Sequence, residues 1–212
     1  LLVLDMKTDG GRGDVTEEII GILGQFKGRT VTFVNDRGVS AGAFIAVATQ
    51  RTFMVPGSVI GAAAPIMMAP GGGVQELPET MEAKMNSAIR ALVRSKAEKN
   101  GYNLEAIEAM IDRNREVVID GQTSNRQGEI LTLTDTEAAR AYGDPPRPLL
   151  SSGTMASLDA LLTHLGVPAE ARTTVEPTGA EQLAFWLNSL NWLWLIIGVG
   201  GIMTIDDCME FL

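Results

Sequence analysis

The stretch "NDRGVSAGAFIAVATQ" (residues 35–50) places a serine, Ser40, at the head of a run of very small residues. An apolar pattern with helical spacing follows, so Ser40 is expected in the first turn of a helix. Its hydroxyl would lie beside backbone amides that lack partners within the helix, where the helix dipole favours negative charge. Small neighbours would let a substrate carbonyl approach closely, as at a nucleophile elbow. The pattern indicates a nucleophilic serine, with a plain N-cap serine as the alternative.

The residues before this stretch predict an α/β fold with a parallel sheet. Residues 1–6 ("LLVLDM") are continuously apolar, as in a strand covered on both faces, and residues 29–35 ("RTVTFVN") alternate and are rich in β-branched side chains. A helical pattern separates the two strands, so they should pair in parallel. The turn at Gly10 and Gly11, one β-α-β unit before Ser40, is then expected at the same edge of the sheet as the serine.

Two backbone amides near Ser40 are candidates for holding an oxyanion. The amide of Ala41, at the start of the helix, can donate to a developing negative charge, and the turn at Gly10 and Gly11 can supply the second donor. Taken alone, the glycine pair also fits an ordinary tight turn, so that alternative stays open.

The histidine and the cysteine of this chain are not expected to supply a catalytic base or a metal site. The only histidine, His164, lies near the end of a surface helix, and this position argues against a Ser-His-Asp triad. The single cysteine, Cys208, excludes an internal disulfide framework, and the two residues together exclude a zinc site of the usual kind. A nucleophilic serine would therefore need another base, for which lysine is the plausible side chain.

Lys84 is the strongest of the five lysines as a general base. It shares a predicted helix face with Met81, Ala88 and Leu92, and apolar neighbours lower the pKa of a lysine by removing its hydration. A neutral amine is what a general base requires. The alternative is a lysine whose stem packs while its ammonium reaches water. Lys7, beside the glycine turn, is the competing base, but its aspartate neighbours would keep it charged.

The composition divides the chain into four parts. We expect a folded domain over residues 1–166, a connector over 167–184, a strongly apolar helix over 185–203 and an unassigned tail over 204–212. The apolar segment begins with three tryptophans, as at a membrane interface, and indicates a transmembrane or interfacial helix. A buried or partner-docking helix is the alternative.

The charge of the chain bears on its partners. The formal net charge is −9, which argues against a nucleic-acid partner, because nucleic-acid binding needs a basic surface.

The glycine- and proline-rich residues 69–78 predict a loop, which is a candidate lid over the site.

Four segments together resemble a known family. "LDMKTDGGRGD", "VSAGAFIAVAT", "VPGSVIGAAAPI" and "LTLTDTEAARAYG" follow the order and spacing found in the NfeD-like, membrane-bound ClpP-class serine proteases. Signal peptide peptidase A is similar at a greater distance. The resemblance covers residues 1–165. It departs from the family pattern in the turn "KTDGG", which lacks the usual proline, and in a longer segment between Ser40 and Lys84.

The resemblance implies a ClpP/crotonase-like spiral of β-β-α units, followed by a transmembrane helix. Ser40 and Lys84 match the family's Ser-Lys dyad, and Gly11 and Ala41 match its oxyanion positions, with Gly10 in the same turn. The first strands of the fold are expected to lie outside this chain. The family acts without metal or cofactor. Its implied partners are apolar polypeptide substrates, stomatin- or prohibitin-family membrane proteins, the membrane and further copies of the chain, with the protease domain on the extracytoplasmic (periplasmic) side.

Two functions of other classes remain as alternatives. A crotonase-type acyl-CoA enzyme shares the fold and the oxyanion turns but needs a carboxylate acid or base. A catalytically idle scaffold of the same fold would organise a membrane assembly through the apolar segment.

Overall fold

The computed structural model describes residues 1–64, 67–68, 74–75, 79–119, 122–176 and 179. The chain divides into two compact units, Leu1–Val167 and Pro168–Leu212, of which the second contains one described element, the short helix η1 (Ala169–Ala171). The apolar segment 185–203, the tail 204–212 and most of the predicted lid lie outside the described residues. Within the described ranges, no helix has both the length and the hydropathy that a membrane crossing requires.

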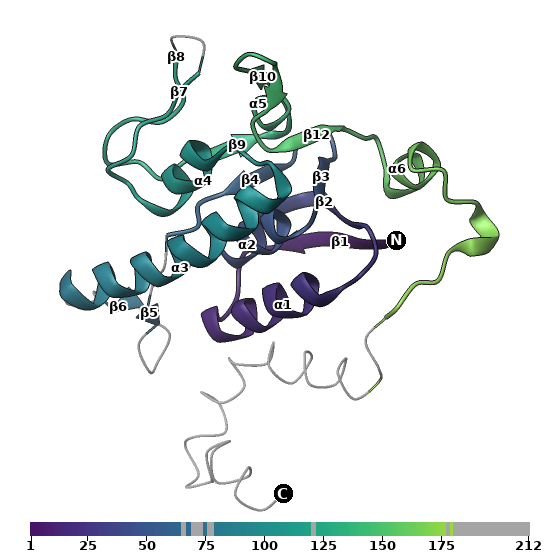
Figure 1. Cartoon of the computed structure of the whole chain (residues 1–212), viewed down its shortest axis with the longest axis horizontal. Helices are drawn as coiled ribbons and strands as arrows, with labels where there is room; N and C mark the ends of the chain where they lie inside the picture. Colours follow the sequence, from purple (N-terminus) through teal and green to yellow (C-terminus); the bar gives the residue numbers. More distant parts are fainter. Residues whose placement is uncertain (65–66, 69–73, 76–78, 120–121, 177–178, 180–212) are drawn as a thin grey trace, which may run out of the picture. The chain divides into compact units, whose positions relative to one another are not determined.

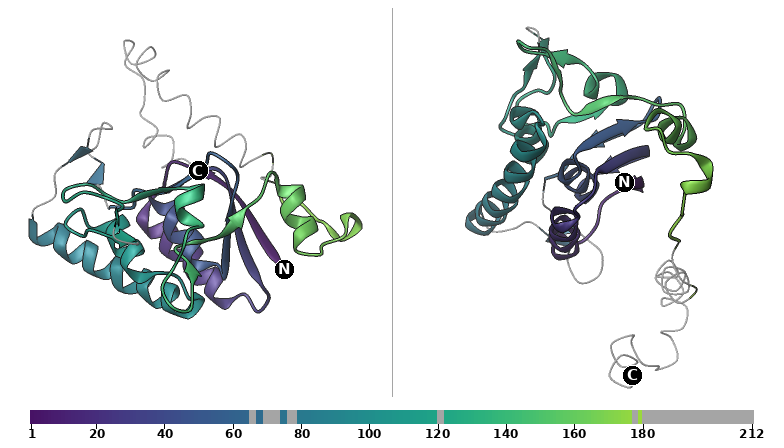
Figure 2. Two further views of the ribbon diagram at one scale, coloured as in Figure 1. Left: turned by 90° about the horizontal axis from the view of Figure 1, so that it is seen from above. Right: turned by 45° about the vertical axis from the view of Figure 1, so that its right-hand side comes forward.

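The first unit is built on a curled six-stranded sheet (Figures 1 and 2). Its central strand β2 pairs in parallel with β1 along one edge and with β3 and β4 along the other. Beyond these, β12 pairs in parallel with β3, and β9 pairs antiparallel with β4. The strands are β1 (Leu2–Thr8), β2 (Thr30–Val39), β3 (Arg51–Met54), β4 (Val59–Gly61), β9 (Thr132–Thr134) and β12 (Ser151–Thr154).

The parallel pairing predicted for the strands over residues 1–6 and 29–35 is therefore confirmed, and β3, β4 and β12 extend the parallel sheet, whereas β9 is antiparallel. Two helices rather than one separate β4 from β9 along the chain, so the connection is not a simple β-α-β crossover. The remaining strands form three short hairpins: β5 (Met67–Met68) with β6 (Val74–Gln75), β7 (Val118–Ile119) with β8 (Gln122–Thr123), and β10 (Ala141–Tyr142) with β11 (Arg147–Pro148).

Helices cover both faces of the sheet. Helix α2 packs on β2 and is flanked by α1 and α3, whereas α6 packs on the opposite face of β2, as the two views in Figure 2 show. Helix α4 follows α3 and packs against it. The helices are α1 (Gly13–Gln25), α2 (Ala41–Ala48), α3 (Glu79–Asn100), α4 (Leu104–Ile111), α5 (Asp135–Ala138) and α6 (Leu158–His164).

The alternation of β2 divides the core into two clusters. Val31 and Phe33 point to the α6 side, where they pack with Phe53 and Leu161. Val34 points to the α2 side and joins the larger cluster, which includes residues of α1, α2, α3 and α4. Because both faces of β2 are covered, its first half is buried without interruption, although its sequence alternates. The continuous burial predicted for residues 1–6 is wrong, because among the described strands β1 pairs only with β2 and is fully buried only at Met6.

The small residues of α2 let the end of β1 approach the helix closely. A methyl group at Gly42 would lie 2.5 Å from Cγ2 of Thr8 and 3.4 Å from the sulfur of Met6. Ala43 and Ala46 are fully buried in the larger cluster. The small residues after Ser40 are thus required for the packing of α2, as well as for the approach of a substrate to the serine.

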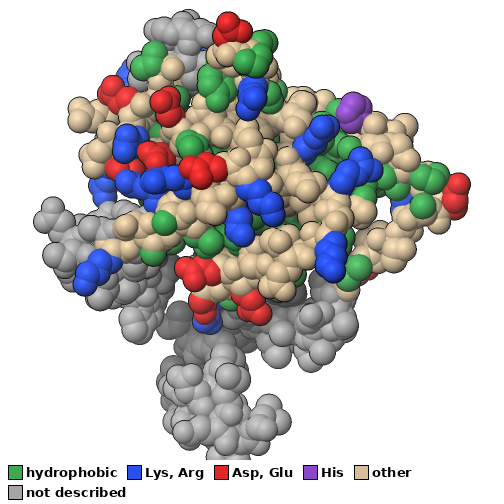
Figure 3. Space-filling model, in the orientation of Figure 1, with side chains coloured by type: hydrophobic (Ala, Val, Ile, Leu, Met, Phe, Trp, Pro, Cys, Tyr) green, Lys and Arg blue, Asp and Glu red, His purple; other side chains and the backbone are tan. Residues whose placement is uncertain are grey.

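Polar contacts fix α3 on α2 and α4. The side-chain amide of Asn100 donates to the carbonyl of Val47 at 2.9 Å, at the C-terminal end of α3. Arg90 pairs with Asp112 at 2.9 Å, and Arg94 pairs with Glu108 of α4 at 3.1 Å. Figure 3 shows acidic and basic side chains interspersed on this face of the molecule. Helix α3 is therefore held firmly along its second half.

Tyr102, just after α3, ties the end of this helix to the sheet. Its hydroxyl donates to the carbonyl of Thr49 at 3.0 Å and shares a hydrogen bond of 3.0 Å with the hydroxyl of Thr52. Burial raises the pKa of the phenol to about 12, because the phenolate would lose its hydration.

We predict that Tyr102 stays protonated in the folded protein until the pH approaches about 12. A phenol in the unfolded chain ionises near its ordinary pKa of about 10, so the free energy of unfolding should fall as the pH rises from about 10 towards 12. Absorbance at about 295 nm, in the range where phenolate absorbs, should resolve this late titration, and Tyr102→Phe should remove it. The variant should also lose about 1 kcal/mol of stability at neutral pH through its missing hydrogen bonds. A titration of Tyr102 near pH 10 in the folded state would contradict the account.

Candidate active site

Ser40 lies at the junction of β2 and α2 in a backbone conformation that serine rarely adopts. Its φ is 55° and its ψ is −119°, a region populated almost only by glycine. An N-cap residue has extended backbone and a side chain that accepts from the helix, whereas Ser40 has neither. The N-cap alternative is therefore wrong, and the strained turn presents a half-buried hydroxyl, as a nucleophile elbow does.

The neighbouring strand β4 holds this turn in place. The amide of Ser40 donates to the carbonyl of Gly61 at 2.9 Å, and the carbonyl of Ser40 accepts from Ala43 at 3.0 Å. Gly61 and Ala62 also have positive φ angles, of 135° and 46°. A side chain at Gly61 would come within 2.5 Å of the Leu131 carbonyl oxygen, so this position requires glycine.

The glycine turn lies against Ser40, as the parallel pairing predicted. A methyl group at Gly10 would lie 2.8 Å from Cβ of Ser40 and 3.1 Å from its Oγ, and one at Gly11 would lie 4.0 Å from Cβ of Ala41. Gly10 has a φ of 128°, and its amide donates to the hydroxyl of Thr8 at 3.1 Å. The structure thus brings together four of the five predicted site residues.

The amides of Gly11 and Ala41 both remain available as donors. Neither forms a hydrogen bond with any other residue that the structure describes. At the first turn of a helix such an unpaired amide is expected for Ala41. The pair is suited to an oxyanion hole, a role that stays a prediction.

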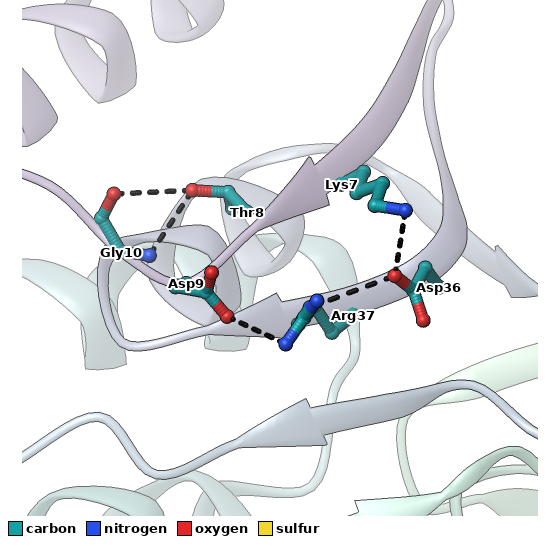
Figure 4. A network of polar contacts seen from close by, with 6 residues as sticks. All are labelled: Lys7, Thr8, Asp9, Gly10, Asp36 and Arg37. Atoms are coloured by element: carbon teal, nitrogen blue, oxygen red, sulfur yellow. Dashed lines mark hydrogen bonds and ion pairs between the residues drawn. The ribbon is translucent and has the colours of Figure 1, made fainter. Parts of the chain in front are cut away.

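Lys7 takes part in an exposed ion-pair network beside the glycine turn (Figure 4). Its ammonium lies 2.9 Å from Asp36, and Arg37 pairs with both Asp36, at 3.5 Å, and Asp9, at 3.1 Å. The hydrogen bond from Lys7 is the main cause that holds the pKa of Asp36 below its usual range. Because Lys7 is bound to a carboxylate, it is poorly placed to act as a neutral base.

An apolar cleft of about 110 Å³, open to solvent, adjoins Ser40. It lies between α1, α2 and α3, and Ser40, Gly11 and Ala41 form part of its wall. The sequence interpretation missed most of its other lining residues. The helical spacing of Ile89, Leu92 and Val93 is the one signal that could have identified them. The lining residues of the cleft other than those of the two turns are Gly13, Thr16, Glu17, Ile20, Phe44, Ala63, Ile89, Leu92 and Val93.

Lys84 is not brought to the cleft. Its side chain is exposed, as is that of Ala88, whereas Leu92 on the same helix lines the cleft. The expectation that apolar neighbours desolvate Lys84 is therefore wrong for this conformation, because Ala88 is too small and too exposed to cover it. Its role as general base stays a prediction.

The structure also places the remaining candidates of the sequence. His164 lies at the exposed end of α6, with its ring edge-on to Phe53 at 5.8 Å, on the face of the sheet opposite α2. The predicted surface position of His164 near the end of its helix is confirmed. Across the described ranges, no group of three or more His, Cys, Asp or Glu side chains is arranged to hold a metal ion.

This chain belongs to the family of NfeD1b N-terminal domains, whose sequence profile matches residues 1–175. The membrane protein NfeD1b of Bacillus subtilis is 27% identical over 189 residues, 89% of this chain and 39% of that protein. The membrane-bound protease PH1510 of Pyrococcus horikoshii is 29% identical over 116 residues, 53% of this chain and 25% of that protein.

The chain thus spans well under half the length of either relative. Its fold also resembles solved structures of 1510-N, a membrane-bound stomatin-specific protease. A variant in which one lysine is replaced by alanine, in complex with a substrate peptide, matches with a TM-score of 0.64 and 22% identity over 88% of this chain and 82% of that one. A serine-to-alanine variant matches with a TM-score of 0.59 and 22% identity over 83% and 82% of the two chains. These likenesses establish the fold.

We predict that replacing Ser40 with glycine stabilises the protein. Glycine adopts the observed backbone angles without strain, so Ser40→Gly should raise the free energy of unfolding by about 1 kcal/mol relative to Ser40→Ala. Chemical denaturation of the two variants would measure the difference. Ala43→Gly, inside α2, is the control and should lose about 1 kcal/mol relative to the parent. If Ser40→Gly is no more stable than Ser40→Ala, the turn is not strained.

Proposed function

We propose that this chain is the peptidase domain of a membrane-associated serine endopeptidase, with Ser40 as nucleophile and Lys84 as general base. The observation that carries the proposal is the backbone of Ser40, which costs about 1–3 kcal/mol and caps nothing. Strain of this kind persists where a side chain must be presented to a substrate. The alanine and glycine neighbours and the open cleft leave room for a peptide chain at the hydroxyl.

The reaction that fits this arrangement is acylation followed by hydrolysis. Oγ of Ser40 attacks the peptide carbonyl carbon while its proton passes to the neutral amine of Lys84. The amides of Gly11 and Ala41 hold the resulting oxyanion, each lowering the barrier by about 3 kcal/mol. The carbon–nitrogen bond then breaks as Lys84 returns the proton to the leaving amine. Water, deprotonated by Lys84, attacks the acyl-enzyme and releases the acid and free Ser40.

The assignment of Lys84 requires the first turns of α3 to approach Ser40 when a substrate is bound. The second half of α3 already forms one wall of the cleft, and Lys84 precedes Ile89 of that wall by five residues, about 7.5 Å along the helix. The lysine-to-alanine variant of 1510-N holds a substrate peptide, which supports a lysine in the reaction of that protein. The matching order of serine, loop and helix supports the same role for Lys84 in this chain.

By the same likeness we propose apolar segments of stomatin- or prohibitin-family membrane proteins as substrates. The relative 1510-N is described as specific for stomatin, and the cleft beside Ser40 has mostly apolar walls. We further propose that residues 185–203 attach the domain to the membrane, that the domain lies on the extracytoplasmic side, that it acts as an oligomer, and that its strands continue the ClpP/crotonase-like spiral.

The exposed position of Lys84 favours one competing function, that of a catalytically idle scaffold. Such a protein would keep the fold and the membrane attachment and would bind partners without cutting them. The dyad and the scaffold make opposite predictions for variants of Ser40 and Lys84.

We predict that the full chain cleaves apolar peptides and that Ser40→Ala abolishes the cleavage. Lys84→Ala should lower kcat by about 100-fold or more, because a general base contributes on that order. Peptide cleavage followed by mass spectrometry would identify the cut bond and measure the rates of all variants.

Lys96→Ala is the matched control, because Lys96 lies on the same helix but contacts Gly24 of α1 rather than the cleft. This variant should cut at the parental rate. A Lys84→Ala variant that cuts as fast as the parent would show that the base lies elsewhere. A folded parent chain that cuts no peptide, with or without membranes, would favour the scaffold.

A further inference from the structure

The cleft beside Ser40 contains one charged side chain. Its walls are formed largely by apolar groups, among them Ile20 of α1, Phe44 of α2 and Val93 of α3. Glu17, a solvent-exposed residue on the first half of α1, is the only lining residue with an ionisable side chain among those the structure describes. A carboxylate in an otherwise apolar cleft selects ligands by charge as well as by shape.

No cation of the described chain neutralises Glu17. Its carboxylate forms no ion pair and no side-chain hydrogen bond with any other described residue. The guanidinium of the neighbouring Arg12 already forms an ion pair with the carboxylate of Asp14, at 2.6 Å. The ammonium of Lys96 lies 3.0 Å from the position of a methyl group on Gly24, which is two turns, about 10 Å, further along α1. The cleft thus offers an unpaired negative charge to whatever enters it.

We propose that the cleft binds a lysine or arginine side chain of the peptide substrate. The aliphatic stem would lie on the apolar walls, and the cationic end would pair with Glu17. A wholly apolar side chain would fill the same walls but would have no charge to pair with the exposed carboxylate. This inference rests on the proposed function, because it takes the cleft as the place where the substrate side chain beside the cut is held. It adds a basic residue to a substrate class that is otherwise apolar.

The test measures binding, so it does not depend on cleavage. Full-chain protein carrying Ser40→Ala is titrated into fluorescent apolar peptides that differ at one central residue, which is lysine, norleucine or glutamate. Norleucine matches the lysine stem without its charge. Fluorescence anisotropy should give an affinity about five-fold higher for the lysine peptide than for the norleucine peptide at low salt. The glutamate peptide should bind most weakly, and added salt should reduce the preference.

Two glutamate variants in the Ser40→Ala background separate the cleft from the general surface. Glu17→Gln should abolish the lysine preference while retaining affinity for norleucine. Glu18→Gln, at the next residue, which is also exposed but lies outside the cleft wall, should retain the preference. Equal affinities for lysine and norleucine, a preference that survives Glu17→Gln, or no binding of any peptide would overturn the inference.

The parent chain separates this result from the proposed function. A Glu17-dependent preference in binding, with no cleavage by the parent, would leave the cleft assignment intact and defeat the peptidase. Cleavage that depends on Ser40 but not on the charge of the central residue would support the peptidase and defeat the cleft assignment.

Discussion

The contact between the Gly10 turn and Ser40 is the constraint on which the site depends. Because β1 pairs in parallel with β2, the segments that follow the two strands leave the sheet at the same edge. Gly10 has no side chain, so its backbone can lie directly against Ser40. The hydrogen bond from the Ser40 amide to Gly61 then fixes the serine from the β4 side. Since three neighbouring strands hold this one turn, the packing of the sheet can supply the energy that the strained backbone needs.

The cleft follows from the same arrangement. Helix α2 begins at the serine and packs on β2, and its small residues draw α1 and α3 close on either side. The space left between these helices is lined by Ser40, by apolar side chains and by one carboxylate. The proposed nucleophile and the proposed binding surface are therefore consequences of one strand–helix junction. The proposed base is different, because Lys84 lies beyond the part of α3 that this packing fixes.

The sequence predicted the features that depend on neighbouring residues. The strand predicted over residues 29–35 and the helix predicted to begin at Ser40 agree with the structure, as does the proximity of Gly10 to Ser40. The strain at Ser40 was not predictable, because it depends on the distant carbonyl of Gly61. The antiparallel strand β9 and the exposure of Lys84 also follow from tertiary packing, which local periodicity does not encode. Local periodicity likewise gives no sign that Glu17 borders the cleft, because its place near α3 is set by tertiary packing.

Covalent labelling of the full chain with a fluorophosphonate tests the central claim most directly. Such a probe reacts with a serine only where the hydroxyl is activated and an oxyanion can be held. The account predicts one adduct, on the tryptic peptide of residues 38–51, whose only serine is Ser40. A folded chain that gains no adduct, or gains one on another peptide, would contradict the claim that Ser40 is a nucleophile.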